Sequence, residues 1–405
     1  MIVQRELKPK GGNYKGVALK RLRVRFVFWA SLSATPLNVG LSQSPPRWQL
    51  TRDFFLGQDD PQVEAAFSKI KAVRVAPNGN VFVADARSRQ VRMFDREGRH
   101  RKLVMRDGRG PGDLTNLGEM GVLADTLWTT DLNLRRLTQL TQNGEVVRTE
   151  PFDQASARTA GEPASVALAG LLPNGEAIGL GDTRHIMFES YERGIPHLLL
   201  RTNRSARALD TLATVSVKNT ISIYRDGPSM ILTIQRFSDA PIVRVDGNGA
   251  RIYVIDRTVS ANAKSAAVTV AAIKPNGDTI WTRSLSYYPR RIEKAAADSF
   301  RLEVDRSHAG TSLKARDREK LAFIPPYRPP ISDAIVSADG NLWMRREEGQ
   351  PQVEYWVLSR QGVLIGSVML PRTSKVVEAS GAHVWGVETD EDEIPRVVRY
   401  SIRRQ

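Results

Sequence analysis

A short pattern that recurs six times along the chain constrains its fold more than any other feature. Each copy is a turn that leads into a short apolar strand with a large side chain at its centre. The six central residues are Phe82, Trp128, Ile178, Tyr253, Trp343 and Trp385. Self-similarity of this kind indicates a repeat architecture, in which each unit completes its core by packing against its neighbours.

Most copies are followed by a second pattern, an alternating strand that ends in a glycine turn. It occurs at 91–98, 137–144, 268–277 and 355–362. Alternation with a period of two residues, together with turns of the Asn-Gly type, predicts antiparallel hairpins. Each unit then holds about four short strands, and such a sheet repeated around an axis is a propeller blade. We predict an all-β fold, a six-bladed β-propeller of four-stranded antiparallel blades.

The two ends of residues 46–405 are expected to close the ring. The last repeat is short of strands before Gln405, whereas the run from Trp48 to Phe55 has no turn partner nearby. Pairing these ends completes the last blade and leaves the ring without an open edge. The blades are expected near 70–104, 117–150, 164–215, 241–287, 331–370 and 376–404, the last together with 47–55.

Two intervals between central residues are longer than the 40–45 residues of a plain blade and therefore contain insertions. The first insertion, at 216–240, holds two further alternating runs, 220–224 and 230–234. The second covers 289–330 and ends in a proline-rich stretch, which is stiff and extended. Its earlier part favours helix, so we expect a helical insertion near 291–323.

Residues 1–45 differ from the rest of the chain. They hold eight basic residues against the single acid Glu6, and the basic part is followed by the short apolar stretch Phe26–Ala34 and by small residues up to Ser44. This order is typical of a secretory signal peptide. The alternative is a disordered basic tail. The signal predicts an exported protein, periplasmic or extracellular, whose mature body keeps about half of the net charge of +15.

Composition excludes several classes of site. The chain has no cysteine, which rules out disulfides, thiolate metal ligands, a cysteine nucleophile and iron–sulfur clusters. It has no run of about 18 apolar residues, so no transmembrane helix is expected in the mature chain. The basic excess is interleaved with acids, as at 283–320, and the aromatic residues occupy blade cores. Nucleic-acid binding is therefore not expected, whereas anionic glycans, lipid headgroups or an acidic partner stay possible.

Over residues 46–405 the sequence resembles the bacterial six-bladed β-propeller proteins of the NHL/TolB-like group. Three features carry the resemblance: the glycine-rich segment 107–114, the spacing from Asp85 to Arg89 and from Asp131 to Arg135, and the turn and strand 339–343. Blades four to six lack the Asp-to-Arg spacing. The resemblance implies a binding platform, a sensor domain or an enzyme, and supports the fold far more than any function.

Four acids near the ends of the recurring strands form the candidate site: Asp85, Asp131, Asp256 and Glu388. Equivalent positions of each blade lie at one height around the axis, so these carboxylates could bind a divalent cation such as Ca²⁺ or Zn²⁺. The site would then resemble that of the metal-dependent lactonase propellers. The alternative is that each acid accepts hydrogen bonds from backbone N–H groups of its own turn, which the shared Asp-to-Arg spacing favours.

Two functions are compatible with these patterns. The preferred hypothesis is an exported, non-catalytic binding propeller without a cofactor. We expect it to be a monomer whose protein, glycan or small-molecule ligand binds on the loop face. The insertions would shape that site, because binding residues concentrate on loops held by a rigid scaffold. The alternative is a metal-dependent hydrolase, lactonase-like enzyme or lyase with Asp85, Asp131, Asp256 and Glu388 at the channel mouth.

Overall fold

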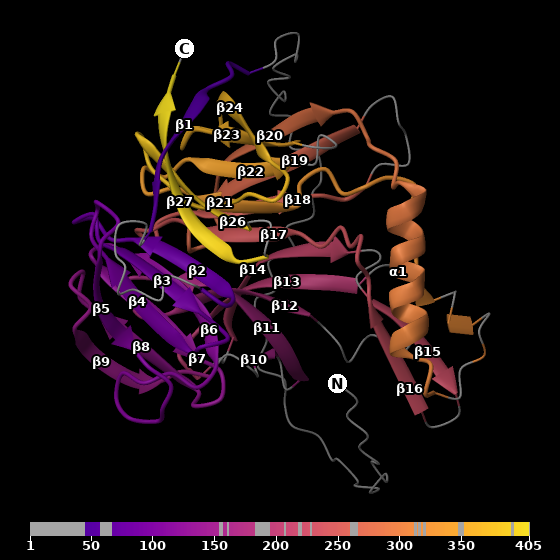
Figure 1. Cartoon of the computed structure of the whole chain (residues 1–405). Coiled ribbons are helices and arrows are strands. Elements are labelled where there is room, and N and C mark those ends of the chain that lie inside the picture. The colour runs from indigo at the N-terminus through magenta and orange to yellow at the C-terminus, as the bar shows by residue number, and fades with distance from the viewer. Residues whose placement is uncertain are drawn as a thin grey trace, which may run out of the picture. The chain divides into compact units, whose positions relative to one another are not determined.

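The chain folds into a ring of β-sheets with one helix beside it (Figure 1), as seen in a computed structural model. The predicted signal peptide lies outside the described residues as far as residue 44. The structure describes residues 45–404 apart from 57–66, 154–156, 160–161, 183–194, 206–207, 218–220, 227–228, 260–265, 312–313, 315–316, 319–320, 347–351 and 390–392.

The first three blades follow one another along the first half of the chain. Blade 1 contains β2 (Ile70–Val75), β3 (Val81–Asp85), β4 (Gln90–Phe94) and β5 (His100–Met105). Blade 2 contains β6 (Leu117–Leu123), β7 (Thr126–Asp131), β8 (Arg136–Leu140) and β9 (Val146–Pro151). Blade 3 contains β11 (Glu162–Leu171), β12 (Ala177–Asp182), β13 (Ile195–Thr202) and β14 (Ala208–Val217), and the short β10 (Ala157–Thr159) pairs with β11 as a fifth strand.

The other three blades complete the ring. Blade 4 contains β17 (Ile242–Val245), β18 (Ile252–Asp256), β19 (Ala266–Ile273) and β20 (Thr279–Tyr287). Blade 5 contains β21 (Asp333–Val336), β22 (Leu342–Arg346), β23 (Gln352–Leu358) and β24 (Leu364–Pro371). Blade 6 contains β25 (Lys375–Ala379), β26 (His383–Thr389), β27 (Pro395–Arg403) and the N-terminal β1 (Gln49–Phe55).

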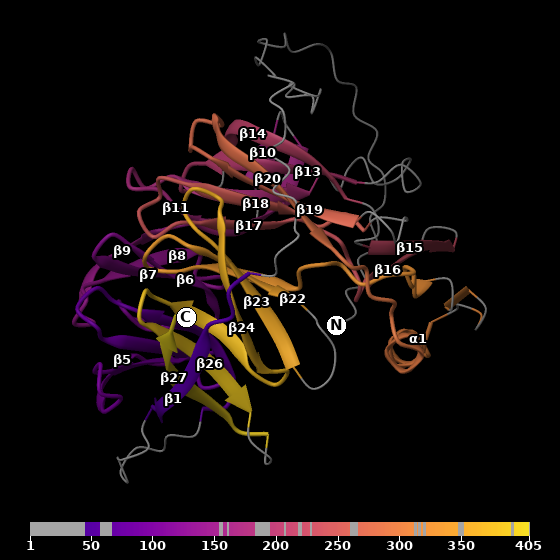
Figure 2. The ribbon, with the colours of Figure 1, turned by 90° about the horizontal axis from the view of Figure 1, so that it is seen from above.

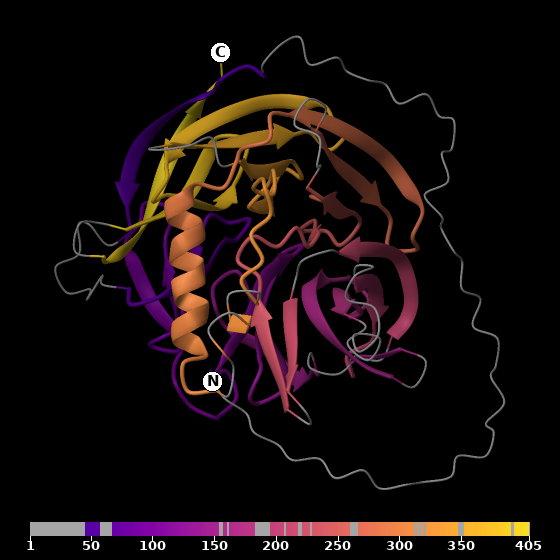
Figure 3. The same cartoon turned by 90° about the vertical axis from the view of Figure 1, so that its right-hand side faces the viewer.

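The first strand of each blade faces the axis, and these strands contact one another in a closed cycle. β2 contacts β6, β6 contacts β11, β11 contacts β17, β17 contacts β21, β21 contacts β25, and β25 returns to β2. In Figure 3 the colours accordingly pass around the ring in chain order. The predicted all-β six-bladed propeller is confirmed.

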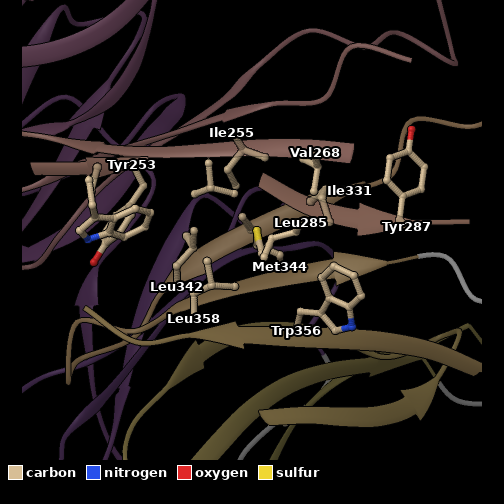
Figure 4. Packing of buried hydrophobic residues seen from close by; sticks show 14 of the residues in the cluster. Tyr253, Ile255, Val268, Leu285, Tyr287, Ile331, Leu342, Met344, Trp356 and Leu358 are labelled. Carbon is tan, nitrogen blue, oxygen red and sulfur yellow. The ribbon is translucent and has the colours of Figure 1, made fainter. Parts of the chain in front are cut away.

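The central residue of each repeat packs against the following blade. Phe82 packs against the core of blade 2, and Trp385 of blade 6 packs against blade 1, which completes the cycle. Figure 4 shows the junction of blades 4 and 5, where Tyr253 lies in one cluster with Leu342, Met344 and Trp356. Alternating apolar strands thus bury both faces of every blade, which explains why an aromatic centre recurs.

Closure of the ring depends on the N-terminal strand. β1 pairs antiparallel with β27, from Gln49 opposite Arg403 to Phe55 opposite Val398 (Figure 1). The residue just before it, Trp48, donates its backbone N–H to the carbonyl of Ser367 at 2.8 Å and is only 6% exposed. The N-terminal segment therefore joins blade 6 to blade 5 as well as completing blade 6, as predicted for its pairing.

The two insertions pack together at one end of the ring (Figure 2). The first forms the hairpin β15 (Ile221–Asp226) and β16 (Ser229–Ile234), and the second contains the helix α1 (Lys294–Ser307). Phe237 and Phe300 meet edge to face, with ring centres 5.9 Å apart, in a cluster with Val304, Leu321 and Ala322. Among the described helices none has the length and apolarity needed to span a bilayer.

Candidate functional site

The end of the ring that carries the insertions is also where the first strand of each blade begins; we call it the entry rim. Asp85 and Asp131 lie on this rim, because they pair with Ile70 and Leu117, the first residues of β2 and β6. Asp256 is the last residue of β18, and Glu388 is the last but one of β26; both lie at the same rim. All four acids therefore lie at or near the end of the second strand of their blades, and their contacts are described next.

Asp85 holds the entry to its own blade. Its carboxylate accepts backbone N–H groups of Ser68 at 2.6 Å and Lys69 at 3.2 Å from the segment before β2, and of Arg87 at 2.9 Å and Ser88 at 3.3 Å from the turn after β3. The side chain thus reinforces the junction of these two segments, where the backbone N–H of Ala86 also donates to the carbonyl of Lys69 at 2.9 Å.

Asp131 repeats this arrangement in blade 2. It accepts the backbone N–H groups of Thr115 at 2.6 Å and Leu134 at 3.0 Å and is almost fully buried. Burial favours the neutral acid, but these donors outweigh it and hold the pKa of Asp131 below its ordinary value. The Arg four residues further on in each blade forms an ion pair with the next linker: Arg89 with Asp107 at 3.1 Å, and Arg135 with Asp153.

The other two acids have different contacts. Asp256 accepts the backbone N–H of Thr258 at 3.0 Å and its hydroxyl at 2.7 Å. Glu388 accepts hydrogen bonds from Tyr400, Arg52 and, at 3.1 Å, Ser374. In the described part of the chain no three His, Asp or Glu side chains come together as a metal site. The geometry thus gives each acid a role in its own blade, and cation binding by them stays a prediction.

A second group of charged residues surrounds a cavity of about 370 Å³ at the entry rim, between the ring and the insertions. We call it the arginine pocket. The hairpin and α1, which lie in front of the ring in Figure 3, belong to the insertions that supply part of its wall. Its lining consists of five arginines and four small or apolar residues: Arg236, Phe237, Ser238, Arg257, Arg328, Pro329, Ser332, Arg345 and Arg372.

Arg257 is the most firmly held of these cations. It follows β18, and its guanidinium donates to the backbone carbonyls of Ala240 at 2.5 Å, Ile331 at 2.7 Å and Ser238 at 3.0 Å. Burial lowers the pKa of Arg257 to about 10, against the opposing effect of the nearby Asp239. The side chain therefore stays charged at neutral pH and fixes the approach to β17 and β21.

The cations from the insertions are also positioned by their neighbours. Arg328 donates to Glu293, at 3.1 Å from Nε, and lies over the ring of Phe237 at 5.5 Å. This hydrogen bond holds the pKa of Glu293 below its ordinary value. Arg236 lies 3.8 Å from Glu303 of α1, where both side chains reach solvent. These two acids reduce the positive charge on the insertion side without lining the cavity.

On the ring side, the pocket arginines lie near a further group of charged residues in blades 4, 5 and 6. Arg345 donates to the carbonyl of Arg372 at 3.1 Å. Below them, Asp333 forms ion pairs with Lys375 at 2.8 Å and Arg244 at 3.0 Å. Burial raises the pKa of Asp333, but the two cations outweigh it and keep the carboxylate ionised. Asp333 also attracts Arg257, and Glu293 attracts Arg372, so acids behind the lining offset part of the positive charge of the pocket.

Such a surface favours anions. A guanidinium offers planar, paired N–H donors that match the oxygens of carboxylates and phosphates. In a partly closed cavity the attraction is stronger than on an open surface, because less water screens it. The volume is within the range of small-molecule binding sites. The arrangement can therefore hold a ligand with more than one anionic group.

Comparison with known proteins adds little beyond the fold. No protein-family model matches the chain, and no curated protein matches its sequence. Among solved structures, a provisionally assigned exported protein from Bacteroides fragilis is 8% identical with a TM-score of 0.46, over 88% of this chain and 95% of that one. Virginiamycin B lyase from Staphylococcus aureus is 10% identical with a TM-score of 0.40, over 88% and 99% of the two chains.

A member of the DUF4221 family from Bacteroides vulgatus is 9% identical with a TM-score of 0.42, over 89% of this chain and all of that one. Similarities this distant support no inference about what the chain binds or catalyses. The propeller fold rests on the sheets described above, and the function has to be argued from the arginine pocket.

Sequence reasoning did not find this pocket. Its arginines come from five segments, which lie after β16, after β18, before β21, at the end of β22 and after β24. In the sequence, none of these arginines is distinguished from an ordinary surface arginine. The one feature of the sequence that pointed to this pocket was the position of the two insertions, which we expected to shape the binding site. They supply Arg236 and Arg328.

Proposed function

We propose that the protein is an exported, non-catalytic binding propeller whose ligand carries carboxylate, phosphate or sulfate groups and occupies the arginine pocket. The observation that carries the proposal is a cavity lined by five arginines and no acidic residue. Glu293 and Glu303 offset part of this charge from outside the lining, so the inner surface of the cavity itself presents guanidinium groups and no carboxylate. An anion bound in the cavity would be held by several charge-assisted hydrogen bonds from these guanidinium groups.

The lining favours binding over catalysis. Proton transfer in enzymes is mostly performed by His, Asp, Glu, Lys, Tyr or Cys, and none of the nine lining residues is of these types. The hydroxyls of Ser238 and Ser332 would need a neighbouring base to act as nucleophiles. The same side chains are well suited to hold an anion, because hydroxyl and guanidinium groups both donate hydrogen bonds.

Export and membership of the NHL/TolB-like group belong to this proposal. Export is supported by the basic start, short apolar stretch and small residues of 1–45. Membership of the group is supported by the Asp-to-Arg spacing of blades 1 and 2. The two acids accept backbone N–H groups of the turns that follow them, and the two arginines form ion pairs with the next linkers. The mass of the mature N-terminus after expression in a native host tests export, and an intact segment up to Ser44 would contradict it.

The binding proposal is tested by calorimetric titration of the full protein at low ionic strength. The probes are galacturonate, citrate and inorganic phosphate, with galactose as the uncharged match of galacturonate. We expect the anions to bind and galactose not to bind, and we expect the affinity to fall as salt is added. Binding of galactose as tight as that of galacturonate, or no binding of any of the three anions, would refute the proposal.

Two variants locate the binding. Arg372→Gln removes a charge from the pocket but keeps the backbone carbonyl that Arg345 donates to. A hydrogen bond to a charged group contributes about 1.5–3 kcal/mol, so we expect the affinity for galacturonate to fall roughly 10- to 100-fold. Arg101→Gln, on the outer strand β5, is the matched control, because Arg101 is largely exposed and far from the pocket lining. Equal losses in both variants would show that the binding is not local.

A further inference from the structure

A small hollow of about 20 Å³ adjoins the arginine pocket. Its lining includes Arg328 and Pro329, which also line the arginine pocket, so the two spaces meet at these residues. The rest of its lining comes from the ends of blades 4 and 5 and from the segment before β21: Tyr287, Tyr288, Arg290, Pro330 and Arg346. We call this second set the tyrosine subsite. The two spaces therefore share a wall made by Arg328 and Pro329.

The ring of Tyr288 is the most distinctive feature of the tyrosine subsite. Its neighbour Tyr287 is buried and anchors the end of β20, whereas Tyr288 is 89% exposed. No other large apolar or aromatic residue of the described chain exceeds 57% exposure. A phenol ring presented in this way offers a flat apolar face and a hydroxyl, the combination that makes tyrosine frequent in binding sites.

The walls around Tyr288 are fixed before any ligand arrives. Pro329 and Pro330 restrict the backbone, and the N–H of Arg328 donates to the carbonyl of Arg290 at 2.8 Å. Arg346 bonds to Glu354 at 2.5 Å and stacks over Trp356 with its guanidinium carbon 3.7 Å from the ring centre. A rigid subsite loses little conformational entropy on binding, and favours a ligand that is rigid as well.

We propose that the ligand is an acidic oligosaccharide, with one sugar acid in the arginine pocket and the next sugar ring against Tyr288. This inference rests on the proposed anion-binding function and extends it to a ligand class. The C–H groups on one face of a pyranose carry partial positive charge and pack on the negative face of an aromatic ring. The carboxylate of the same sugar would then lie near Arg290, at the edge of the tyrosine subsite.

An acidic peptide is the other extended polyanion to consider. Its carboxylates sit on flexible side chains, whose ordering costs free energy for each group that is fixed. It also has no flat apolar face for Tyr288 to contact. A rigid chain of sugar acids satisfies both the cations and the exposed ring, which is why the geometry favours it.

The test is a calorimetric titration with galacturonate and its dimer, trimer and tetramer. We expect the affinity to rise at least about fivefold from monomer to dimer or trimer, as the second sugar reaches Tyr288. Tyr288→Ala should abolish that rise and leave the affinity for the monomer unchanged, whereas Tyr288→Phe should keep most of the rise. Ile280→Ala, an exposed position near the other end of β20, is the matched control and should behave like the wild type.

The outcomes separate the two proposals. If the monomer binds but longer oligomers bind no better, or if Tyr288→Ala keeps the full rise, the oligosaccharide inference is overturned and anion binding stands. If oligoglutamate gains affinity with length and oligogalacturonate does not, the ligand is an acidic peptide. If no anion binds at all, both proposals fail. Melting temperatures of the variants, measured alongside, show whether each is folded.

Discussion

Gly366→Ala tests how the N-terminal segment closes the ring. Gly366 lies in β24 of blade 5, directly against the indole of Trp48. A Cβ added at Gly366 would lie 2.2 Å from Cε2 and 2.6 Å from Nε1 of that ring. Trp48 cannot easily yield, because it is buried and packs edge-on against Trp343 with ring centres 6.0 Å apart. The alanine variant must therefore displace Trp48 from the junction of blades 5 and 6.

The size of the effect follows from these contacts. Overpacking of a well-filled core costs about 1–3 kcal/mol, and complete loss of a buried Trp side chain about 3–5 kcal/mol. We expect Gly366→Ala to lower the free energy of unfolding by about 3 kcal/mol. Gly386→Ala in β26 is the matched control, since its added Cβ would have no neighbour closer than 3.5 Å. Its stability should stay within about 1 kcal/mol of the wild type.

Urea unfolding followed by far-ultraviolet circular dichroism measures both variants. The sharper test places Gly366→Ala in a Trp48→Ala background, where the clash has no partner and should add less than about 1 kcal/mol. If Gly366→Ala costs no more than Gly386→Ala, or costs the same with and without Trp48, the indole does not hold the two blades together as inferred.

Two pH-dependent variants address buried carboxyl groups. Asp131→Asn should lower stability at neutral pH, because the backbone donors, although burial opposes them, hold the pKa of Asp131 below 3.8. The stabilisation by the ionised carboxylate is present above pH 3.8 and is lost as pH falls through the lower pKa of the folded state. Melting temperatures of variant and wild type that do not converge in acid would contradict this. Glu378→Gln should act in the opposite sense, because burial raises the pKa of Glu378 from 4.5 to about 7, against the attraction of Arg74. The carboxyl group of Glu378 therefore destabilises the folded state increasingly as pH rises from 4.5 to 7. The melting temperature of Glu378→Gln should be higher than that of the wild type at pH 8 and equal to it at pH 4.

Local patterns were sufficient to predict the ring, because strand alternation and glycine turns are encoded by neighbouring residues. Gly79 is an example: its φ of +92° suits the turn before β3, and its N–H donates to the carbonyl of Ala76 at 2.8 Å. The limits of α1 were harder to predict. The helix begins at Lys294, and the preceding Glu293 binds Arg328 instead of capping the helix with its side chain. A partner 35 residues away cannot be recognised from helical periodicity.

The candidate acids show a similar limit. Both hypotheses, a cation site and a turn acceptor, assign the same residues, and they differ only in what surrounds the carboxylates. For Asp85 and Asp131 the hydrogen-bond donors include Ser68 and Thr115, which precede them by 17 and 16 residues. These donors are backbone N–H groups, which every residue except proline possesses, so no side-chain pattern marks them.

The arginine pocket links ligand binding to the way the insertions sit on the ring. Arg236 and Arg328 come from the insertions, whereas Arg257, Arg345 and Arg372 come from the blades. Glu303 and Glu293 offset part of the charge of the insertion arginines, and the repulsion that remains opposes docking of the insertions on the blades. Under the proposed function, an anion that contacts both sets would reduce this repulsion and would bind the assembled form best. Its binding free energy would then add to the stability of that assembly, increasingly as the ligand concentration exceeds the Kd.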